Sequence, residues 1–203
     1  LVGDTSVKEQ FKEIMEDRKK KKLLKAAVVV AYGLLQDKDS IPSLTGMLEK
    51  QPDDPIMAPY LIMVLGMLGD EKTIAPIKAL WDKVGKNVAA TAYTNMAVAL
   101  TMLGKRAEVI NQLKEHSAKT NKDSTLRQYA FHALGLLGDR AAGQTFIDSF
   151  KDEKSDSIKS YIVIGIGLMM EKTPMPMLAE WTADNNTEVS TLIIDHLLPL
   201  PTW

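Results

Sequence analysis

The stretch VLGMLGDEKTIAPI at residues 64–77 decides the fold of this chain, because close copies of it recur along almost the whole sequence. The copies are AYGLLQDKDSIPSL at 31–44, VALTMLGKRAEVIN at 98–111, HALGLLGDRAAGQT at 132–145 and GIGLMMEKTPMPML at 165–178. Each copy reads as the end of an apolar helix, a tight turn and the start of a second helix. The sequence therefore predicts a stack of helical repeats.

The copies recur at an almost fixed spacing. The residue just after each turn serves as a marker, and the markers are Asp37, Asp70, Lys105, Asp139 and Glu171. Successive markers are 33, 35, 34 and 32 residues apart. A constant period in this range is typical of arrays in which each helix pair buries its apolar face against its neighbours.

A glycine stands four places before the marker in most copies, at Gly33, Gly66, Gly135 and Gly167, with Thr101 in the remaining one. Glycine inside a helix costs about 1 kcal/mol relative to alanine, so its recurrence at one position requires a structural reason. We expect a neighbouring helix to approach closely there, because a larger side chain would hold the two backbones apart.

Gly69, Gly104 and Gly138 directly precede the marker. This placement is typical of the left-handed C′ residue that ends a helix. The acidic markers follow at the start of the second helix, where we expect the carboxylate to accept backbone N–H groups and to complement the helix dipole. Prolines in or near the first turn also indicate a second helix, as at Pro42, Pro76, Pro174 and Pro176.

The pattern LGxLGD, followed by a helix with apolar residues four and seven places after the marker, resembles the HEAT repeat. Arg127 and Lys159 match the basic residue that such repeats often carry early in the first helix, and Lys25 is equivalent. Lys105 and Thr101 depart from the pattern. The resemblance implies an all-α fold, an α-solenoid of about five stacked antiparallel helix pairs with an unpaired helix at each end. It also implies that the second helices line the concave side.

We expect a single HEAT-like domain over residues 1–203, as part of a longer protein. Its predicted units are a partial unit at 1–20, full units at about 22–51, 55–85, 87–119, 124–152 and 157–183, and a terminal helix at 187–198. The first residues, LVGD, match the turn at 67–70 and lie one period before the first marker. The chain is therefore expected to open on the second helix of a repeat whose first helix is missing.

Composition argues against several classes of protein. Lys and Arg number 25 and Asp and Glu 26, for a net charge of −1, so no nucleic-acid partner is expected. The chain has no cysteine, which excludes disulfides and Cys-based zinc sites. The apolar runs reach about half of the ~20 residues that a membrane-spanning helix requires, so no membrane span is expected. The compartment stays open, with the cytoplasm favoured over the periplasm.

The sequence lacks a catalytic constellation, so we expect neither an enzyme nor a cofactor or metal. The motifs HExxH, GxSxG and GxxxxGK[ST] are absent. His132 falls in a column of apolar residues, and His116 is isolated. Tyr60, Tyr129 and Tyr161 share one repeat position, which we interpret as packing between repeats, with the hydroxyl at the surface, rather than as a ladder that stacks bases.

Several residues of the predicted second helices fall outside the packing stripe, and these are the predicted partner-binding residues. They are Ser43, Met47, Pro76, Asn111, Lys114, Thr145, Asp148, Met177 and Trp181. Trp81 and Trp181 occupy nearly equivalent places, and either one is alternatively a core residue.

The run RKKKK at residues 18–22 is the densest cluster of charge. One interpretation is a contact for phosphate, an anionic lipid or an acidic partner. The other, which the sequence alone favours, is a solvated loop balanced by Glu13, Glu16 and Asp17.

Three functions are compatible with these features. We favour a non-enzymatic scaffold that presents its concave face to a protein or peptide partner, because repetition builds an extended groove and reactive groups are lacking. A HEAT-like bilin lyase is the first alternative and would need a chromophore-sized pocket with convergent polar groups. A nucleic-acid-binding module, as in the HEAT-like DNA glycosylases, is the second and would need Lys and Arg gathered along one groove.

Overall fold

The computed structural model describes residues 5–84 and 90–170, and within these ranges the chain forms helices and no β-strand. The helices are α1 (Thr5–Glu16), α2 (Lys22–Leu34), α3 (Ile41–Lys50), α4 (Met57–Met67), α5 (Ile74–Trp81), α6 (Ala90–Met102), α7 (Arg106–Ser117), α8 (Ser124–Leu136), α9 (Gly143–Asp152) and α10 (Asp156–Met170). Short 3₁₀ turns at Lys38–Ser40, Glu71–Thr73 and Arg140–Ala142 precede α3, α5 and α9. The predicted all-α class is confirmed for these residues, and the terminal helix predicted at 187–198 lies outside them.

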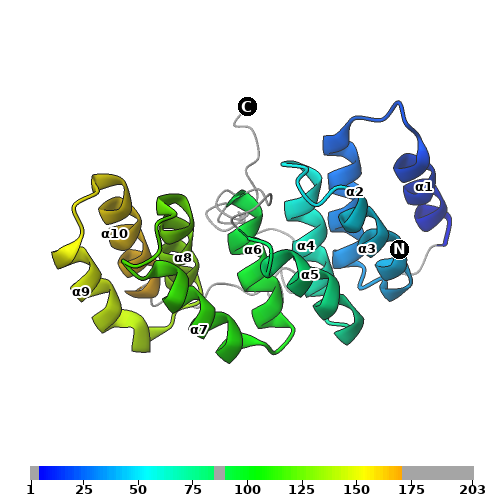
Figure 1. The fold of residues 1–203 in the computed structure, drawn as a ribbon. Coiled ribbons are helices and arrows are strands. Elements are labelled where there is room, and N and C mark those ends of the chain that lie inside the picture. Colours follow the sequence, from blue (N-terminus) through cyan, green and yellow to red (C-terminus); the bar gives the residue numbers. More distant parts are fainter. Residues whose placement is uncertain (1–4, 85–89, 171–203) are drawn as a thin grey trace.

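The helices fall into two sets. The first helices are α2, α4, α6, α8 and α10, and each packs against the next one in that order. The second helices are α1, α3, α5, α7 and α9, and each packs against the first helix that follows it in the chain. Figure 1 shows the first helices in a row from α2 to α10, with α3, α5, α7 and α9 along one side of that row.

The turn that joins the two helices of a unit has the backbone geometry that the sequence predicts. Gly69, Gly104 and Gly138 have φ angles of +64°, +81° and +61°. Glycine adopts this left-handed conformation without the steric cost that a Cβ imposes. Gln36 occupies the same place in the first turn with φ +52°, and its side-chain amide donates to the carbonyl oxygen of Met67 in the next turn at 3.3 Å.

The predicted close approach of neighbouring helices is confirmed at two of the recurring glycines. A Cβ placed on Gly66 would lie 2.7 Å from the Cα of Ala99, and one on Gly135 would lie 2.5 Å from the Cα of Gly165. Both distances are far below van der Waals contact, so the backbones of α4 and α6, and of α8 and α10, meet where no side chain fits. At Gly33 the neighbours are the methyl groups of Val64 at 3.1 Å.

The described residues do not test the prediction at Gly167: none of their atoms lies within 4 Å of a Cβ there, and residues 171–203, which follow α10, lie outside the described ranges. Within those ranges α10 is the last helix of the row. Val29, Ile62 and Phe131 stand eight places before their markers and are all 0% exposed, whereas the equivalent Val163 is 54% exposed. No helix of the described ranges packs on the face of α10 that carries Val163.

Among the turns that the structure describes, the prediction that the acidic marker caps the second helix holds at one, and Glu171 lies outside them. The carboxylate of Asp70 accepts the backbone N–H of Lys72 at 2.9 Å. Asp37 and Asp139 make no such cap. Asp37 instead pairs with Lys8 at 2.6 Å, and Asp139 pairs with Lys114 at 3.2 Å. In both turns the carboxylate binds a lysine ammonium from the preceding second helix instead of a backbone N–H group. The local sequence does not reveal this lysine, because it lies about one repeat away in the chain.

The basic residue early in the first helix contacts the end of the preceding second helix. Lys25 Nζ donates to the carbonyl oxygen of Met15 in the last turn of α1 at 2.8 Å. Arg127 Nε donates to the carbonyl oxygen of Ser117 at the end of α7 at 3.4 Å. Lys159 Nζ lies 5.6 Å from the ring centroid of Phe150 in the last turn of α9. A cation is favourable at a helix C-terminus, where unpaired carbonyl groups concentrate negative partial charge.

Candidate functional site: the surface of the second helices

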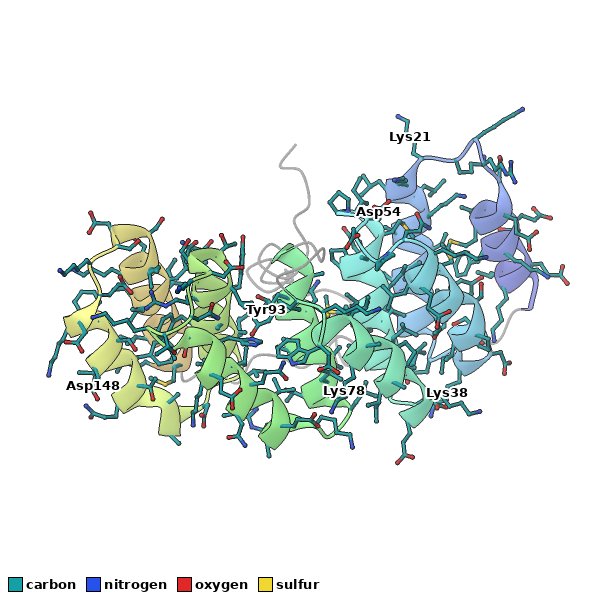
Figure 2. The ribbon with its side chains drawn as sticks, in the orientation of Figure 1. Lys21, Lys38, Asp54, Lys78, Tyr93 and Asp148 are labelled. Carbon is teal, nitrogen blue, oxygen red and sulfur yellow. The ribbon has the colours of Figure 1, made fainter. Side chains whose placement is uncertain are left out.

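The predicted partner-binding residues lie on four second helices, with two exceptions. Ser43 and Met47 are on α3, Pro76 on α5, Asn111 and Lys114 on α7, and Thr145 and Asp148 on α9, while Met177 and Trp181 lie outside the described residues. Ser43, Asn111 and Asp148 are exposed, and the others are half-buried. Figure 2 shows Asp148 on the outer side of α9. These side chains are spread along the row of helices and do not converge on one point.

Three of these residues have contacts within the fold. Met47 packs against the hydrophobic core. Lys114 forms the ion pair with Asp139, and Asp148 accepts a hydrogen bond from the side-chain amide of Gln144 at 2.8 Å. Their roles are thus at least partly structural. Ser43 is different, because it lines a cleft.

The cleft lies between α1 and α3 and has a volume of about 340 Å³. Tyr32 of α2 and residues at the turn before α3 also line it. The lining residues are Lys8, Lys12, Met15, Glu16, Tyr32, Asp37, Asp39, Ser40, Ser43 and Leu44. Its volume is at the lower end of the range of small ligand sites, about 300–1,000 Å³.

Burial divides the lining of the cleft into two kinds of side chain. Tyr32 and Leu44 are buried and Met15 is half-buried, so these three supply apolar surface. The exposed members include Lys12 and Asp39, which carry charges of opposite sign. A cleft of this kind suits a polypeptide segment that places an apolar side chain on the buried part and polar groups at the edge.

An ion pair and an aromatic contact hold α1 in place beside the cleft. Lys8 Nζ lies 2.6 Å from a carboxylate oxygen of Asp37, whose side chain is only 7% exposed. The hydrogen bond to Asp37 raises the pKa of the Lys8 ammonium, so Lys8 stays charged across the physiological range. The ring of Phe11 meets that of Tyr32 edge to face, with centroids 5.6 Å apart. Burial raises the pKa of the Tyr32 phenol, which keeps this hydroxyl neutral.

The sequence identified Ser43 but none of the α1 residues that line the cleft. Lys8, Lys12 and Glu16 are spaced four residues apart, and this spacing places them on one face of a helix. That polar stripe is the signal that could have found them. What the sequence does not contain is the distance between α1 and α3, which decides whether a cleft exists.

A second cluster of functional groups joins α5, α6 and α7. Trp81 stacks on Tyr93 with ring centroids 4.6 Å apart and an angle of 11° between the rings. The Tyr93 hydroxyl lies 2.7 Å from His116 Nδ1, and the indole N–H of Trp81 donates to Gln112. Trp81 is only 2% exposed and is therefore a core residue, one of the two possibilities that the sequence left open. His116, isolated in the sequence, has a buried partner in space.

The geometry of this cluster indicates a structural role. Burial raises the pKa of Tyr93 and lowers the pKa of His116, so the pair is neutral at pH 7 and holds its hydrogen bond without a charge. The adjacent space, which Trp81 and Gln112 also line, measures about 10 Å³. A space of this size holds about one water molecule, not a substrate.

We expect the free energy of unfolding to fall as the pH is lowered from about 7.5 to about 5.5, by at most about 1.4 kcal/mol per pH unit for one proton. Burial lowers the pKa of His116 below its ordinary value of 6.5, so in the intermediate range only the unfolded chain is protonated there. The stabilisation is complete above the unfolded pKa and is lost as the pH falls below it. Urea unfolding monitored by circular dichroism at a series of pH values measures this dependence.

His116→Gln should flatten that pH profile, because the group that titrates differently in the folded and unfolded chains is removed. His132→Gln is the matched control, since it removes a histidine of the row without touching the Tyr93 contact. An unchanged slope in His116→Gln would show that His116 does not cause the dependence.

Comparison with known proteins finds no family model that matches this chain and no curated protein that matches it. Over residues 5–84 and 90–170, no group of three or more His, Cys, Asp or Glu side chains is arranged to hold a metal ion. None of the helices in the same ranges is long and apolar enough to cross a bilayer. The cleft and the surface of the second helices are therefore the features that bear on function.

Proposed function

We propose that this chain is a HEAT-like α-solenoid that acts as a non-enzymatic interaction module and binds a protein or peptide partner on the surface of its second helices. The repeat period and the ordered packing of first helix on first helix support the solenoid architecture. The cleft between α1 and α3 carries the functional part of the proposal, because it combines a buried apolar wall with charges of both signs. In this proposal the cleft anchors the partner, and the exposed Asn111 and Asp148 extend the contact along the row.

The chemistry of the cleft defines the kind of segment that would bind. An apolar side chain of the partner would contact Tyr32, Leu44 and Met15, and its burial would supply most of the affinity. Lys12 and Asp39 would select charged or polar neighbours on either side of that anchor. A segment with one apolar anchor and flanking charges meets both requirements.

Ser43→Trp should weaken binding of such a peptide at least tenfold, because the indole would occupy space that the partner's anchor needs. The intact chain is first used to select ligands from a displayed peptide library. Dissociation constants of the selected peptides are then measured by fluorescence anisotropy. A loss of about tenfold corresponds to about 1.4 kcal/mol, which is less than one buried side chain contributes.

Ala27→Trp is the matched control for added bulk. Ala27 is exposed on α2, does not line the cleft, and shares its repeat position with three tyrosines, so this position accepts an aromatic ring. The control should bind as the parent chain does. Equal affinity of Ser43→Trp and the parent would refute the cleft as the anchor, and a library that yields no ligand at all would refute the function.

A further inference from the structure

A tip at one end of the row combines exposed cations with exposed apolar side chains. We define the basic tip as residues 18–22, in the connection from α1 to α2, together with Leu23, Leu24 and Ile56. Leu23 and Leu24 lie in the first turn of α2, and Ile56 directly precedes α4. Lys22 Nζ bonds to a carboxylate oxygen of Asp54 at 2.5 Å and so joins the two connections. Figure 2 shows Lys21 and Asp54 near each other at this edge of the molecule.

The aspartates next to the cations are turned toward the backbone. Asp17 accepts the backbone N–H of Lys19 at 2.8 Å. Asp54, whose side chain is 7% exposed, accepts the N–H groups of Ile56 at 3.0 Å and Met57 at 2.9 Å in addition to Lys22. These carboxylates cap the following turns of the chain and are occupied by that role. The acids that the sequence suggested as a balance for residues 18–22 therefore form no surface ion pairs with Arg18, Lys19, Lys20 or Lys21 among the described residues.

The cations of the tip remain exposed. Arg18, Lys19, Lys20 and Lys21 are all exposed, and no ion pair joins them to a carboxylate of the described residues. Asp53 is an exposed acid on the neighbouring connection, and Glu13 and Glu16 lie on the last turns of α1. The outermost part of the tip thus has an excess of positive charge, although the chain as a whole carries −1.

Apolar side chains stand beside these cations. Leu23 is 37% exposed, Leu24 is 43% exposed and Ile56 is 40% exposed. Leu23 and Leu24 lie in the first turn of α2, and Ile56 lies just before α4. The ion pair between Lys22 and Asp54 connects these two places. Single exposed apolar residues are ordinary on protein surfaces. A group of them adjoining a cluster of cations is typical of segments that enter the interface of an anionic membrane.

We propose that the basic tip binds the surface of anionic membranes, with its lysines and arginine at the lipid headgroups and Leu23, Leu24 and Ile56 in the outer acyl region. The shape of the tip favours a membrane over an acidic peptide. The connection from α1 to α2 stands at the outer edge of the described helices (Figure 1), where a flat surface can reach it without meeting the other helices drawn there. A short acidic peptide would bind weakly at such a tip, because tight binding of a peptide needs a groove that buries its side chains.

The test is sedimentation of the intact chain with vesicles of phosphatidylcholine, with or without about 30% phosphatidylserine, in about 0.1 M NaCl. The parent chain should sediment with the anionic vesicles and not with the neutral ones. Each surface cation contributes roughly fivefold to the membrane partition coefficient, so K19Q/K20Q/K21Q should lower it about a hundredfold. Leu24→Ser and Ile56→Ser should each lower it severalfold, because less apolar area is buried at the interface.

The matched control is K83Q/K122Q/K154Q, which removes the same charge from exposed lysines away from the tip. It should bind anionic vesicles as the parent does. Equal binding to neutral and anionic vesicles, no binding to either, or an equal loss in the control would overturn the proposal. Binding to polyglutamate without binding to anionic vesicles would also overturn it and would indicate an acidic polypeptide instead.

Discussion

Gly135→Ala should lower the free energy of unfolding by about 1–3 kcal/mol or more, although alanine is the better helix former. The added Cβ would lie 2.5 Å from both the Cα and the carbonyl oxygen of Gly165. These are backbone atoms of the facing helix and cannot rotate away, so α8 and α10 must separate along their contact. The separation would also loosen the surrounding core, where Phe131 and Phe146 pack with ring centroids 5.3 Å apart.

Gly46→Ala is the matched control and should change stability in the opposite direction. Gly46 lies within α3, and no neighbouring side chain or helix of the described part of the chain comes within 4 Å of the position of a Cβ there. Alanine at this position should therefore raise the free energy of unfolding by up to about 1 kcal/mol. Urea unfolding monitored by circular dichroism measures both variants. A stabilised Gly135→Ala would mean that α8 and α10 do not meet as closely as described.

Arg127→Ala should cost about 3–5 kcal/mol, the largest effect expected of a polar substitution in this chain. Arg127 Nη2 lies 2.5 Å from a carboxylate oxygen of Glu153, and both side chains are less than 10% exposed. The same carboxylate accepts the N–H groups of Lys154 at 2.8 Å and Ser155 at 2.9 Å. Removing the guanidinium leaves a buried negative charge without its cation between α9 and α10. It also removes the bond from Arg127 to Ser117 that ties α8 to α7.

The pH dependence of stability distinguishes this ion pair from simple packing. Burial alone would raise the pKa of Glu153, but the two backbone N–H groups and Arg127 outweigh burial and lower it. The carboxylate thus stabilises the fold fully above its unfolded pKa near 4.5, and this contribution is lost as the pH falls through the lower folded value. Glu153→Gln should lose less stability than the parent between about pH 5 and pH 3.

Lys78→Ala is the control for an ion pair at the surface. Lys78 pairs with Glu108, and their side chains are 43% and 48% exposed. Water screens this pair, so its loss should lower the free energy of unfolding far less than Arg127→Ala does. If Lys78→Ala and Arg127→Ala have equal effects, the burial of the Arg127 pair does not determine its strength.

Features that depend on neighbouring residues could be predicted from the sequence. The left-handed turn at Gly69, Gly104 and Gly138 follows from the cost that a Cβ has at positive φ. The seam at Gly66 and Gly135 could be inferred because a helical glycine is unfavourable unless a close neighbour requires it. Both inferences depend on the conformational preference of glycine relative to other residues, which is the same wherever the glycine occurs.

Features that depend on a second helix could not be predicted in the same way. Asp37 and Asp139 were expected to cap their own helices, but Lys8 and Lys114 reach them from elsewhere in the chain. His116 was isolated in the sequence until the packing of α6 and α7 placed it beside Tyr93. For both aspartates a lysine ammonium and the backbone N–H groups compete for the same carboxylate, and the packing of the helices brings the ammonium within reach.

Period, helix propensity and backbone sterics act over a few residues, so the sequence alone was enough to predict the helices of the described residues, the place of each turn, and the close contacts at Gly66 and Gly135. Three other features appear only once the helices are packed: α1 and α3 leave a cleft, Arg127 and Glu153 are buried together, and the cations at residues 18–21 stay exposed while nearby aspartates turn inward. Those outcomes depend on the spacing and tilt of whole helices. These quantities are set by the summed packing of many side chains and are not encoded in any short stretch.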